Sequence, residues 1–332
     1  MASAVSVLIL LNHPEPVRRK YYEGIRAEFP GLTVDVVDHH SKVGPYIASA
    51  QILLTYGMSM ADHVLSEATQ LRWIHALTTG TDGIDNLPSL RPEVLLTSTH
   101  GIHGAPMSEA ALMAMLALNR DFPRAIRNRD RRAWERWPAR LLEGKTVGIV
   151  GVGLIGAALA PRCKALGMTV VGVDPVQRSV PGVDRMVAWD QVMQVIGDLD
   201  FVVLFVPSSP STRGMINLEL LTAMKPTAYL VNLGRGDVLD DEALIRVLKE
   251  DRIAGAALDV FREEPLPQDH PFWSLGNIII TPHLGGAFDE YPERALPIIQ
   301  ENMRRFLAGD TVNMINIVKR PSGPNNRERY KA

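Results

Sequence analysis

The sequence predicts an α/β protein built from two doubly wound parallel sheets. Short apolar runs of strand type alternate with helical patterns along most of the chain, which is typical of parallel sheets covered by helices. A glycine-rich turn, Gly151–Gly156, lies between one such strand and a helix. The length of 332 residues and the 46% share of hydrophobic residues suit two domains, each with its own core.

The first hundred residues contain five expected strands, with helical patterns between several of them. β-branched and leucine-rich runs define these strands, which are Val5–Leu11, Thr33–Val37, Gln51–Thr55, Leu71–Ala76 and Val94–Thr97. We therefore expect a small α/β domain ahead of the glycine-rich turn.

A linker, a helix and a basic arm are expected between this domain and the glycine-rich turn. Thr99–Pro106 has the composition of a linker, and Ser108 is suited to cap a helix over Glu109–Leu118. That helix is almost wholly apolar, which predicts burial on all sides. The stretch Asn119–Arg140 gathers arginines and two tryptophans. We interpret it as a solvated or subunit-facing arm rather than a nucleic-acid site.

The strand–turn–helix–strand unit Lys145–Asp174 predicts a dinucleotide-binding site. Gly151 permits the tight turn, Gly153 lets a pyrophosphate approach the backbone, and Gly156 lets helix and strand pack closely. The helix that follows presents free N–H groups and the positive end of its dipole to the phosphates.

Asp174 indicates which dinucleotide is bound. It ends a strand 18 residues after Gly156, where a carboxylate accepts hydrogen bonds from a ribose diol. A 2′-phosphate there would meet a like charge, so the sequence favours NAD over NADP. Arg178 and Arg185 are close in the sequence and keep NADP open.

The same alternation continues after Asp174. Helices are expected over Asn217–Met224 and Asp240–Glu250. The strands expected in this half of the chain are Thr146–Val150, Thr169–Val173, Asp200–Val206, Thr227–Asn232, Ile253–Val260 and Asn277–Thr281.

Composition argues against several classes of partner. A net charge of −2 and a pI of about 6.5 give no sign of a nucleic-acid partner. The single cysteine, Cys163, makes no intrachain disulfide and no cysteine metal site, and we expect no metal.

The start lacks the basic region of a signal peptide, and no apolar run reaches roughly 18 residues, the length of a membrane-spanning helix. We expect a cytoplasmic protein without a membrane partner, with a mobile polar tail over Pro321–Ala332.

Three polar residues just past strand ends are suited to catalysis. Arg235 lies between two glycines and offers a planar fork for a carboxylate. Glu264 follows the next strand in a Glu-Glu-Pro turn, and His283 follows the last strand. A carboxylate beside a histidine fixes its tautomer and raises its pKa, which makes a general acid–base pair. Ligands bind at the carboxyl ends of parallel strands, so we expect these residues to form one site.

The motifs around these residues resemble those of a known family. Asn232–Gly236 matches the pattern Asn-x-x-Arg-Gly, Leu258–Pro265 matches Leu-Asp-Val-Phe-x-x-Glu-Pro, and Thr281–His283 matches Thr-Pro-His. Over nearly its whole length the chain resembles the D-2-hydroxyacid dehydrogenase family. This group contains phosphoglycerate dehydrogenase, glyoxylate and hydroxypyruvate reductases and D-lactate dehydrogenase.

The resemblance implies a role for each site residue. Arg235, Glu264 and His283 would be catalytic, and the backbone of Thr79 and Gly80 would hold the substrate carboxylate together with the arginine. Pro207, Ser209 and Thr212 match the family's Pro-x-Thr-x-x-Thr segment beside the cofactor, with a serine replacing the first threonine. The expected cofactor contacts are Met107, Gly151, Gly153, Leu154, Ile155, Gly156, Asp174, Pro207, Ser209, Thr212, Leu233, Gly234, Asp259, His283 and Gly285.

The resemblance also implies the activity and the domain organisation. The reaction would be NAD(H)-dependent hydride transfer between a 2-oxo acid and a D-2-hydroxy acid. A Rossmann domain, residues 104–287, would be inserted into a discontinuous flavodoxin-like substrate domain, residues 1–103 and 288–332, to which Phe288–Val318 returns. The Glu109–Leu118 helix and the arm with Trp134 and Trp137 match the part of the family that forms a homodimer.

Two departures from the family pattern leave the substrate open. The hinge pattern Gly-Val-Asn-Ala is Gly101–Gly104 here, with His103 in place of the asparagine, and Phe288 replaces a threonine. A bulkier, more apolar pocket would draw on Phe288, Tyr291, Tyr56, Met58, Trp134 and Trp137.

Alternatives within the resemblance also remain. Formate dehydrogenases are disfavoured, because they carry a glutamine where Glu264 stands. Phosphite oxidation and an NADH-sensing interaction protein stay open, because both retain the three residue types.

Overall fold

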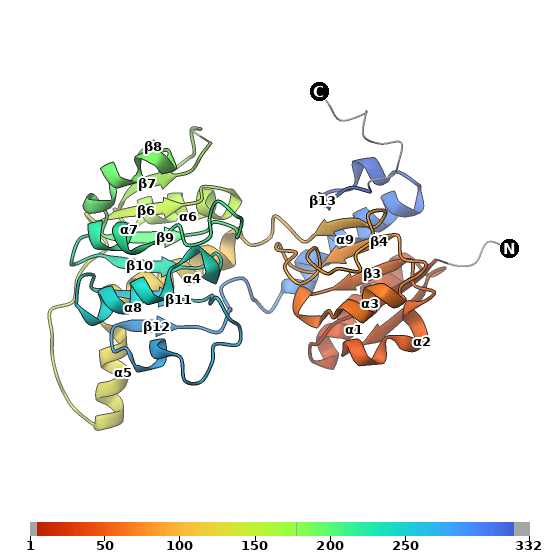
Figure 1. Ribbon diagram of the computed structural model, residues 1–332, viewed down its shortest axis with the longest axis horizontal. Helices are drawn as coiled ribbons and strands as arrows, with labels where there is room; N and C mark the ends of the chain where they lie inside the picture. The colour runs from red at the N-terminus through yellow and green to blue at the C-terminus, as the bar shows by residue number, and fades with distance from the viewer. Residues whose placement is uncertain (1–4, 177, 322–332) are drawn as a thin grey trace. The chain divides into compact units, whose positions relative to one another are not determined.

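The structure, a computed structural model, describes residues 5–176 and 178–321. The chain forms two compact units (Figure 1). Unit 1 contains the residues up to Ile102 and those from Phe288 onward, and unit 2 contains His103–Ala287. The expected division, after residue 103 and before residue 288, lies within one residue of these limits. All of the expected polar tail except Pro321 lies outside the described residues.

Unit 1 contains a six-stranded sheet. Its strands are β1 Ser6–Leu10, β2 Thr33–Val37, β3 Ile52–Thr55, β4 Trp73–Ala76, β5 Leu95–Ser98 and β13 Ile317–Lys319. They lie in the order β13-β5-β4-β3-β1-β2, and every neighbouring pair among β1 to β5 is parallel. The prediction of a parallel sheet is wrong at one edge, where β13 pairs antiparallel with β5. This strand follows the last helix and enters the sheet from the opposite end.

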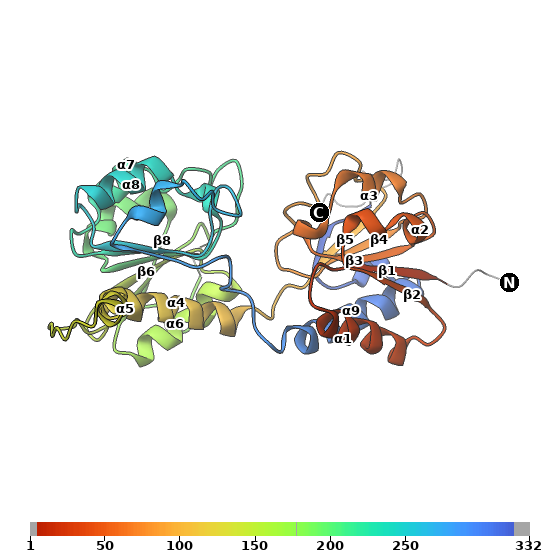
Figure 2. The same cartoon turned by 90° about the horizontal axis from the view of Figure 1, so that it is seen from below.

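Helices cover both faces of this sheet. The helices α1 Glu15–Glu28 and α9 Tyr291–Leu307 pack on one face, and α2 Gly44–Ile47 and α3 Asp62–Glu67 lie on the other (Figure 2). Because side chains alternate between the faces, β1 contributes residues to two separate cores. A strand covered by helices on both faces has a continuous apolar sequence, and this is why β1 could be predicted from the sequence.

Unit 2 contains a seven-stranded sheet in which every neighbouring pair is parallel. Its strands are β6 Thr146–Val150, β7 Thr169–Val173, β8 Arg185–Val187, β9 Phe201–Leu204, β10 Tyr229–Asn232, β11 Gly255–Leu258 and β12 Ile278–Ile280. They lie in the order β12-β11-β10-β9-β6-β7-β8, so the chain reverses its direction of winding between β6 and β9. In open α/β sheets, ligands bind at the carboxyl ends of the strands at such a switch point.

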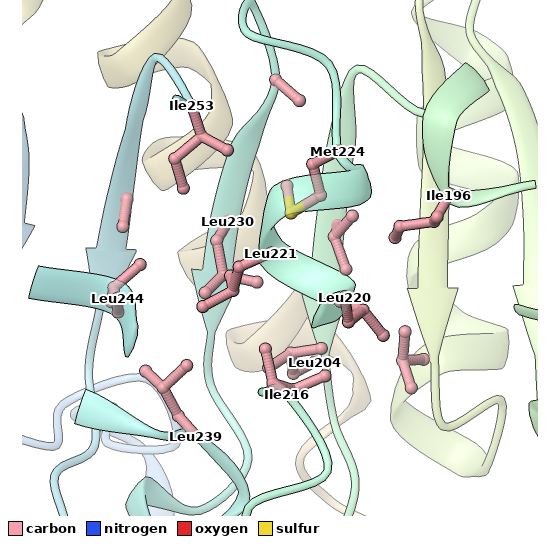
Figure 3. Packing of buried hydrophobic residues seen from close by; sticks show 14 of the residues in the cluster. Ile196, Leu204, Ile216, Leu220, Leu221, Met224, Leu230, Leu239, Leu244 and Ile253 are labelled. Atoms are coloured by element: carbon pink, nitrogen blue, oxygen red, sulfur yellow. The ribbon is translucent and has the colours of Figure 1, made fainter. Parts of the chain in front are cut away.

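The helices of unit 2 form a layer on each face of the sheet. The helices α4 Gly104–Asn119 and α6 Leu154–Ala165 pack on one face, and α7 Leu218–Ala223 and α8 Asp241–Lys249 on the other (Figure 2). Figure 3 shows the second of these cores, where Leu220 and Leu221 of α7 face Leu204 of β9 and Leu230 of β10. All four leucines are at most 3% exposed, so this layer anchors the sheet beneath the switch point.

The structure corrects the prediction for the segment before the glycine-rich turn. Helix α4 begins at Gly104 rather than Glu109, and Ser108 lies inside it, with its hydroxyl donating to the Gly104 carbonyl oxygen at 2.6 Å. Pro106 fits because the N–H groups of a first helical turn have no partner inside the helix. The helix is not buried on all sides, since Met113 and Leu116 are 54% and 43% exposed.

The basic arm contains a helix of its own. Helix α5 spans Phe122–Arg131 and is followed by an extended stretch. Trp134 in that stretch is 89% exposed. The Arg124 guanidinium, by contrast, lies over the Trp137 ring, with 4.7 Å between its central carbon and the ring centre. No helix within residues 5–176 and 178–321 has both the length and the apolar composition of a membrane span.

Candidate active site

The glycine-rich turn joins β6 to α6 at the switch point of unit 2. Gly151 has φ +92°, a conformation that L side chains rarely adopt. A Cβ atom on Gly156 would lie 2.4 Å from the Gly151 carbonyl oxygen, so only glycine lets α6 start this close to the strand. A Cβ on Gly153 would meet nothing within 4 Å. The backbone at Gly153 therefore faces open space at the N-terminus of α6, where Leu154 and Ile155 begin the helix, as a bound pyrophosphate requires.

Asp174 lies at the end of β7, beside this turn. Its carboxylate accepts the N–H groups of Val152 and Val176, each at 2.9 Å. The Arg178 guanidinium donates to the carbonyl oxygen of Val152. The Asp174 carboxylate and the Arg178 guanidinium are thus both hydrogen-bonded to the backbone of the turn. The carboxylate would repel a 2′-phosphate, whereas the guanidinium would attract it.

The segment after β9 is folded on itself at the same switch point. The Thr212 hydroxyl donates to the Pro207 carbonyl oxygen at 2.7 Å and lies 2.9 Å from the Ser209 hydroxyl. The Ser208 hydroxyl donates to Asp237 at 2.5 Å. The three residues expected beside the cofactor therefore belong to one closed loop.

Arg235 is held at the end of β10 by close backbone packing. A Cβ on Gly236 would lie 1.9 Å from the Phe261 carbonyl carbon, and one on Gly234 would lie 2.7 Å from the Val206 carbonyl oxygen. The arginine is thus flanked by two residues that the neighbouring strand ends require to be glycine. Sequence reasoning gave no role to Asn232, whose buried side chain donates to the Arg235 carbonyl oxygen and accepts the Gly234 N–H.

Glu264 and His283 form a hydrogen-bonded pair. The Nδ1 atom of His283 lies 2.7 Å from Oε2 of Glu264, and the N–H of Phe261 donates to the other carboxylate oxygen at 2.9 Å. His283 has φ +53°, and its N–H donates to the Asp259 carbonyl oxygen at 2.8 Å, which fixes the backbone that carries the ring.

The contact between Glu264 and His283 shifts the pKa values of both side chains. The hydrogen bond that His283 donates to Glu264 raises the pKa of His283 above its ordinary value, against the opposing effects of burial and of the Arg235 charge. Burial raises the pKa of Glu264, but the hydrogen bonds from His283 and from the Phe261 N–H outweigh it, so that pKa lies below its ordinary value. The contact therefore favours a protonated imidazole beside an ionised carboxylate, relative to the same two groups held apart.

Asp259 organises the loop that carries His283. Its buried carboxylate accepts the N–H groups of Leu284 and Gly285 at 2.8 Å and the hydroxyl of Thr281 at 2.6 Å. Sequence reasoning missed Thr281 as a positioning residue, although the Thr-Pro-His motif was its signal.

Four of the expected cofactor residues meet at one point of unit 2. A Cβ on Gly285 would lie 2.9 Å from the Asp259 carboxylate, 3.3 Å from the Met107 sulfur and 3.5 Å from Leu233. His103, the residue that departs from the family hinge pattern, is buried and lies against Gly286.

The expected carboxylate loop follows β4 in unit 1. The Thr78 hydroxyl donates to the Gly80 carbonyl oxygen at 2.6 Å, and the Thr79 hydroxyl donates to the Thr99 carbonyl oxygen at 3.4 Å. A Cβ on Gly57 would lie 1.8 Å from the Asp82 carbonyl oxygen, so the end of the loop rests directly on another backbone segment.

The aromatic residues considered for the pocket have different settings. Tyr291 is only 9% exposed, and its hydroxyl donates to the Leu77 carbonyl oxygen at 2.8 Å, so it supports the chain just before the carboxylate loop. Phe288 lies against Tyr291, with 5.1 Å between ring centres. Tyr56 stacks on His13 at 4.8 Å.

The single cysteine and the side chains that could bind a metal have the following settings. Cys163 is buried in α6, and burial raises the pKa of its thiol to about 12. No group of three or more metal-binding side chains gathers within the part of the chain that the structure describes.

Comparison with known proteins identifies the family. The family described as D-isomer specific 2-hydroxyacid dehydrogenase, NAD binding domain, matches residues 112–285. The chain belongs to the D-isomer specific 2-hydroxyacid dehydrogenase family. The residues matched include the glycine-rich turn, Arg235, Glu264 and His283.

Curated relatives of this family agree with the match. The chain is 36% identical over 270 residues to a glyoxylate reductase of Korarchaeum cryptofilum, covering 78% of this chain and 81% of that one. It is 33% identical over 282 residues to a D-3-phosphoglycerate dehydrogenase of Methanocaldococcus jannaschii. That match covers 84% of this chain but 53% of the relative, so the chain spans about half of the length of that enzyme.

Solved structures of the family share the fold. A D-isomer specific 2-hydroxyacid dehydrogenase family protein from Aeromonas salmonicida has a TM-score of 0.87 at 29% identity, covering 95% of this chain and 99% of that one. A D-isomer specific 2-hydroxyacid dehydrogenase from Xanthobacter autotrophicus, in complex with NADPH and MES, has a TM-score of 0.79 at 28% identity, covering 96% and 98%. The prediction of two α/β units with a Rossmann NAD-binding domain is confirmed by these structures and by the family match.

Proposed function

We propose that this protein is an NAD(H)-dependent oxidoreductase that interconverts a 2-oxo acid and a D-2-hydroxy acid. The observation that carries the proposal is the 2.7 Å pair between His283 and Glu264, in the same unit as a glycine turn open at Gly153. A family member needs both a place for the dinucleotide and a group that exchanges a proton with the substrate oxygen.

The residues of the chain divide the work as follows. In unit 2, the planar guanidinium of Arg235 is suited to bind a carboxylate of the substrate. In unit 1, the backbone N–H groups of Thr79 and Gly80 are the contact for a substrate carboxylate that the family resemblance implies. Because Nδ1 of His283 is engaged with Glu264, the proton is exchanged through Nε2. In reduction Nε2 gives its proton to the carbonyl oxygen, and in oxidation it takes the hydroxyl proton. The nicotinamide, when bound, supplies or accepts the hydride.

NAD is the cofactor we propose, with NADP less favoured. Asp174 is fixed beside the turn by two backbone N–H groups, and its charge opposes a 2′-phosphate. The relative from Xanthobacter autotrophicus binds NADPH, and Arg178 is the residue of this chain best placed to favour such a ligand. The ratio of NADPH to NADH turnover measures which charge prevails.

A cytoplasmic homodimer is part of the same proposal. Met113 and Leu116 leave an apolar stripe exposed on α4, and Trp134 is exposed on the arm that follows α5. A second copy of the chain would cover this surface. Light scattering tests the dimer, and cell fractionation tests the location.

The activity is tested by NADH oxidation with glyoxylate, hydroxypyruvate, pyruvate, phenylpyruvate, 2-oxoisocaproate and 3-phosphohydroxypyruvate. We expect turnover with at least one of these acids and its loss by several orders of magnitude in His283→Gln. The outcome that contradicts the proposal is tight NADH binding without turnover of any acid. Phosphite oxidation and NADH-dependent capture of a protein partner would then be measured next.

A further inference from the structure

A fully buried histidine lies in the sheet of unit 1, directly before the carboxylate loop. His75 is on β4, and Thr97 is its cross-strand partner on β5. The Nδ1 atom of His75 lies 2.7 Å from the Thr97 hydroxyl, and Nε2 lies 2.9 Å from the Thr99 hydroxyl. The indole N–H of Trp73 donates to the Thr97 hydroxyl at 2.8 Å.

The hydrogen bonds of this cluster determine where the histidine carries its proton. A threonine hydroxyl has one hydrogen to donate. The Thr99 hydroxyl donates to the Ala76 carbonyl oxygen at 3.2 Å, so it accepts from Nε2–H of His75. The Thr97 hydroxyl accepts from Trp73 and donates to Nδ1. In this arrangement every polar hydrogen of the cluster has an acceptor.

The other protonation states leave a polar hydrogen unpaired. If Nδ1 carried the proton, Thr97 would accept from both His75 and Trp73, and its own hydrogen would find no further acceptor among the described residues. The same holds for the doubly protonated ring. Burial agrees with this, because it lowers the pKa of His75 to about 3. The ring is therefore neutral, with its hydrogen on Nε2.

Thr99 connects this cluster to the carboxylate loop. Its backbone N–H donates to the carbonyl oxygens of Ala76 and Thr78, at 2.9 and 3.0 Å. Its carbonyl oxygen accepts the Thr79 hydroxyl at 3.4 Å. One residue thus contacts the start of the loop through its backbone, while His75 holds its side chain.

We propose that His75 is a positioning residue for the substrate: it fixes Thr99, and Thr99 holds the Thr78–Gly80 loop in the geometry that binds the carboxylate. This inference rests on the proposed reduction of 2-oxo acids. His75 is buried and acts through Thr99, so it touches neither substrate nor cofactor. Its effect is on the KM for the oxo acid, while the cofactor residues of unit 2 are unaffected.

Two matched pairs of variants in the full chain test the proposal. A glutamine amide mimics Nε2 of histidine and an asparagine amide mimics Nδ1, so His75→Gln keeps the donor to Thr99 and His75→Asn loses it. Thr99→Ser keeps the hydroxyl, whereas Thr99→Val removes it at equal volume. Steady-state KM, kcat, NADH affinity and thermal unfolding are measured for all four.

We expect the KM for the oxo acid to rise about fivefold in His75→Asn and Thr99→Val, the change that one neutral hydrogen bond makes, and to stay within about twofold in His75→Gln and Thr99→Ser. NADH affinity stays unchanged in all four. An unchanged KM in the asparagine and valine variants, with only the unfolding temperature lowered, overturns the proposal, because the cluster would then serve stability alone.

A second measurement covers the case in which the damaging variants do not fold. In ¹⁵N-histidine-labelled parent protein, the His75 signals are those missing in His75→Gln. A neutral ring protonated on Nε2 supports the network, and one protonated on Nδ1 overturns it. If the parent reduces no 2-oxo acid, the proposed function fails, whereas this measurement still decides the network.

Discussion

Replacing Glu264 with glutamine tests the acid–base pair most directly. The substitution keeps the shape of the side chain but removes the charge that raises the pKa of His283. Of the influences that then remain, burial and the positive charge of Arg235 lower the pKa of that imidazole, and the negative charge of Asp259 raises it. Reduction needs protonated His283, so its rate falls as pH rises through that pKa. In Glu264→Gln this fall occurs at lower pH.

The contact geometry gives the expected size of the effect. A hydrogen bond between charged groups contributes about 1.5–3 kcal/mol. The His283 side chain is 45% exposed, so water screens the pair and we take the lower end of that range. About 1.4 kcal/mol corresponds to a factor of ten, so reduction on the alkaline side falls about tenfold. Oxidation needs the neutral ring, and its acidic limb extends to lower pH in the same variant.

The assay is kcat/KM for reduction and for oxidation between pH 5 and 9, with Glu263→Gln as a control. Glu263 is the adjacent residue, so its substitution removes the same charge from the same turn. We expect the control to keep the profile of the parent. If the profiles of Glu264→Gln and of the parent coincide in both directions, the carboxylate does not set the protonation of His283.

Three further predictions test the cofactor turn, the arginine loop and unit 1. Gly153→Ala should fold normally but bind NADH about tenfold more weakly, because its methyl fills the space open to the phosphates; titration calorimetry measures this. Gly236→Ala should lower the free energy of unfolding by about 1–3 kcal/mol or more in urea, since its Cβ meets the Phe261 backbone at 1.9 Å. Tyr291→Phe should lose about 1 kcal/mol of stability with its buried hydrogen bond to Leu77; equal urea midpoints would contradict this.

Much of the fold could be predicted because most of its strands are uninterrupted β-branched or leucine-rich runs. Thr33–Val37, Thr146–Val150 and Thr169–Val173 have the limits predicted for them, since each is a β-branched run bounded by turn residues. The start of α4 was predicted wrongly because Gly-Ala-Pro has the composition of a linker, although proline also suits a first helical turn. The strands β8 and β13 were missed, since each has only three residues and is partly exposed.

Part of the candidate site could likewise be predicted from the sequence, and part could not. The glycine turn and the pairing of Glu264 with His283 follow from motifs at strand ends, because parallel strands bring those ends together. The catalytic roles remain predictions until the variants are measured. The hydrogen-bonded cluster around His75 could not be predicted, because it depends on the strand register that places His75 opposite Thr97. The hydrophobic pattern does not reveal this register, because β4 and β5 are buried along their whole length and neither strand has an exposed face.

The division of the chain into a continuous unit 2 and an interrupted unit 1 has a consequence for biosynthesis. A ribosome synthesises all of His103–Ala287 before it makes α9 and β13. Until then, β5 has an unpaired edge, and the core around Tyr21 lacks the side chains of Ile299 and Met303. Domains fold as units during synthesis, so we expect the nucleotide-binding unit to mature first, while the earlier-made segment waits for the last part of the chain.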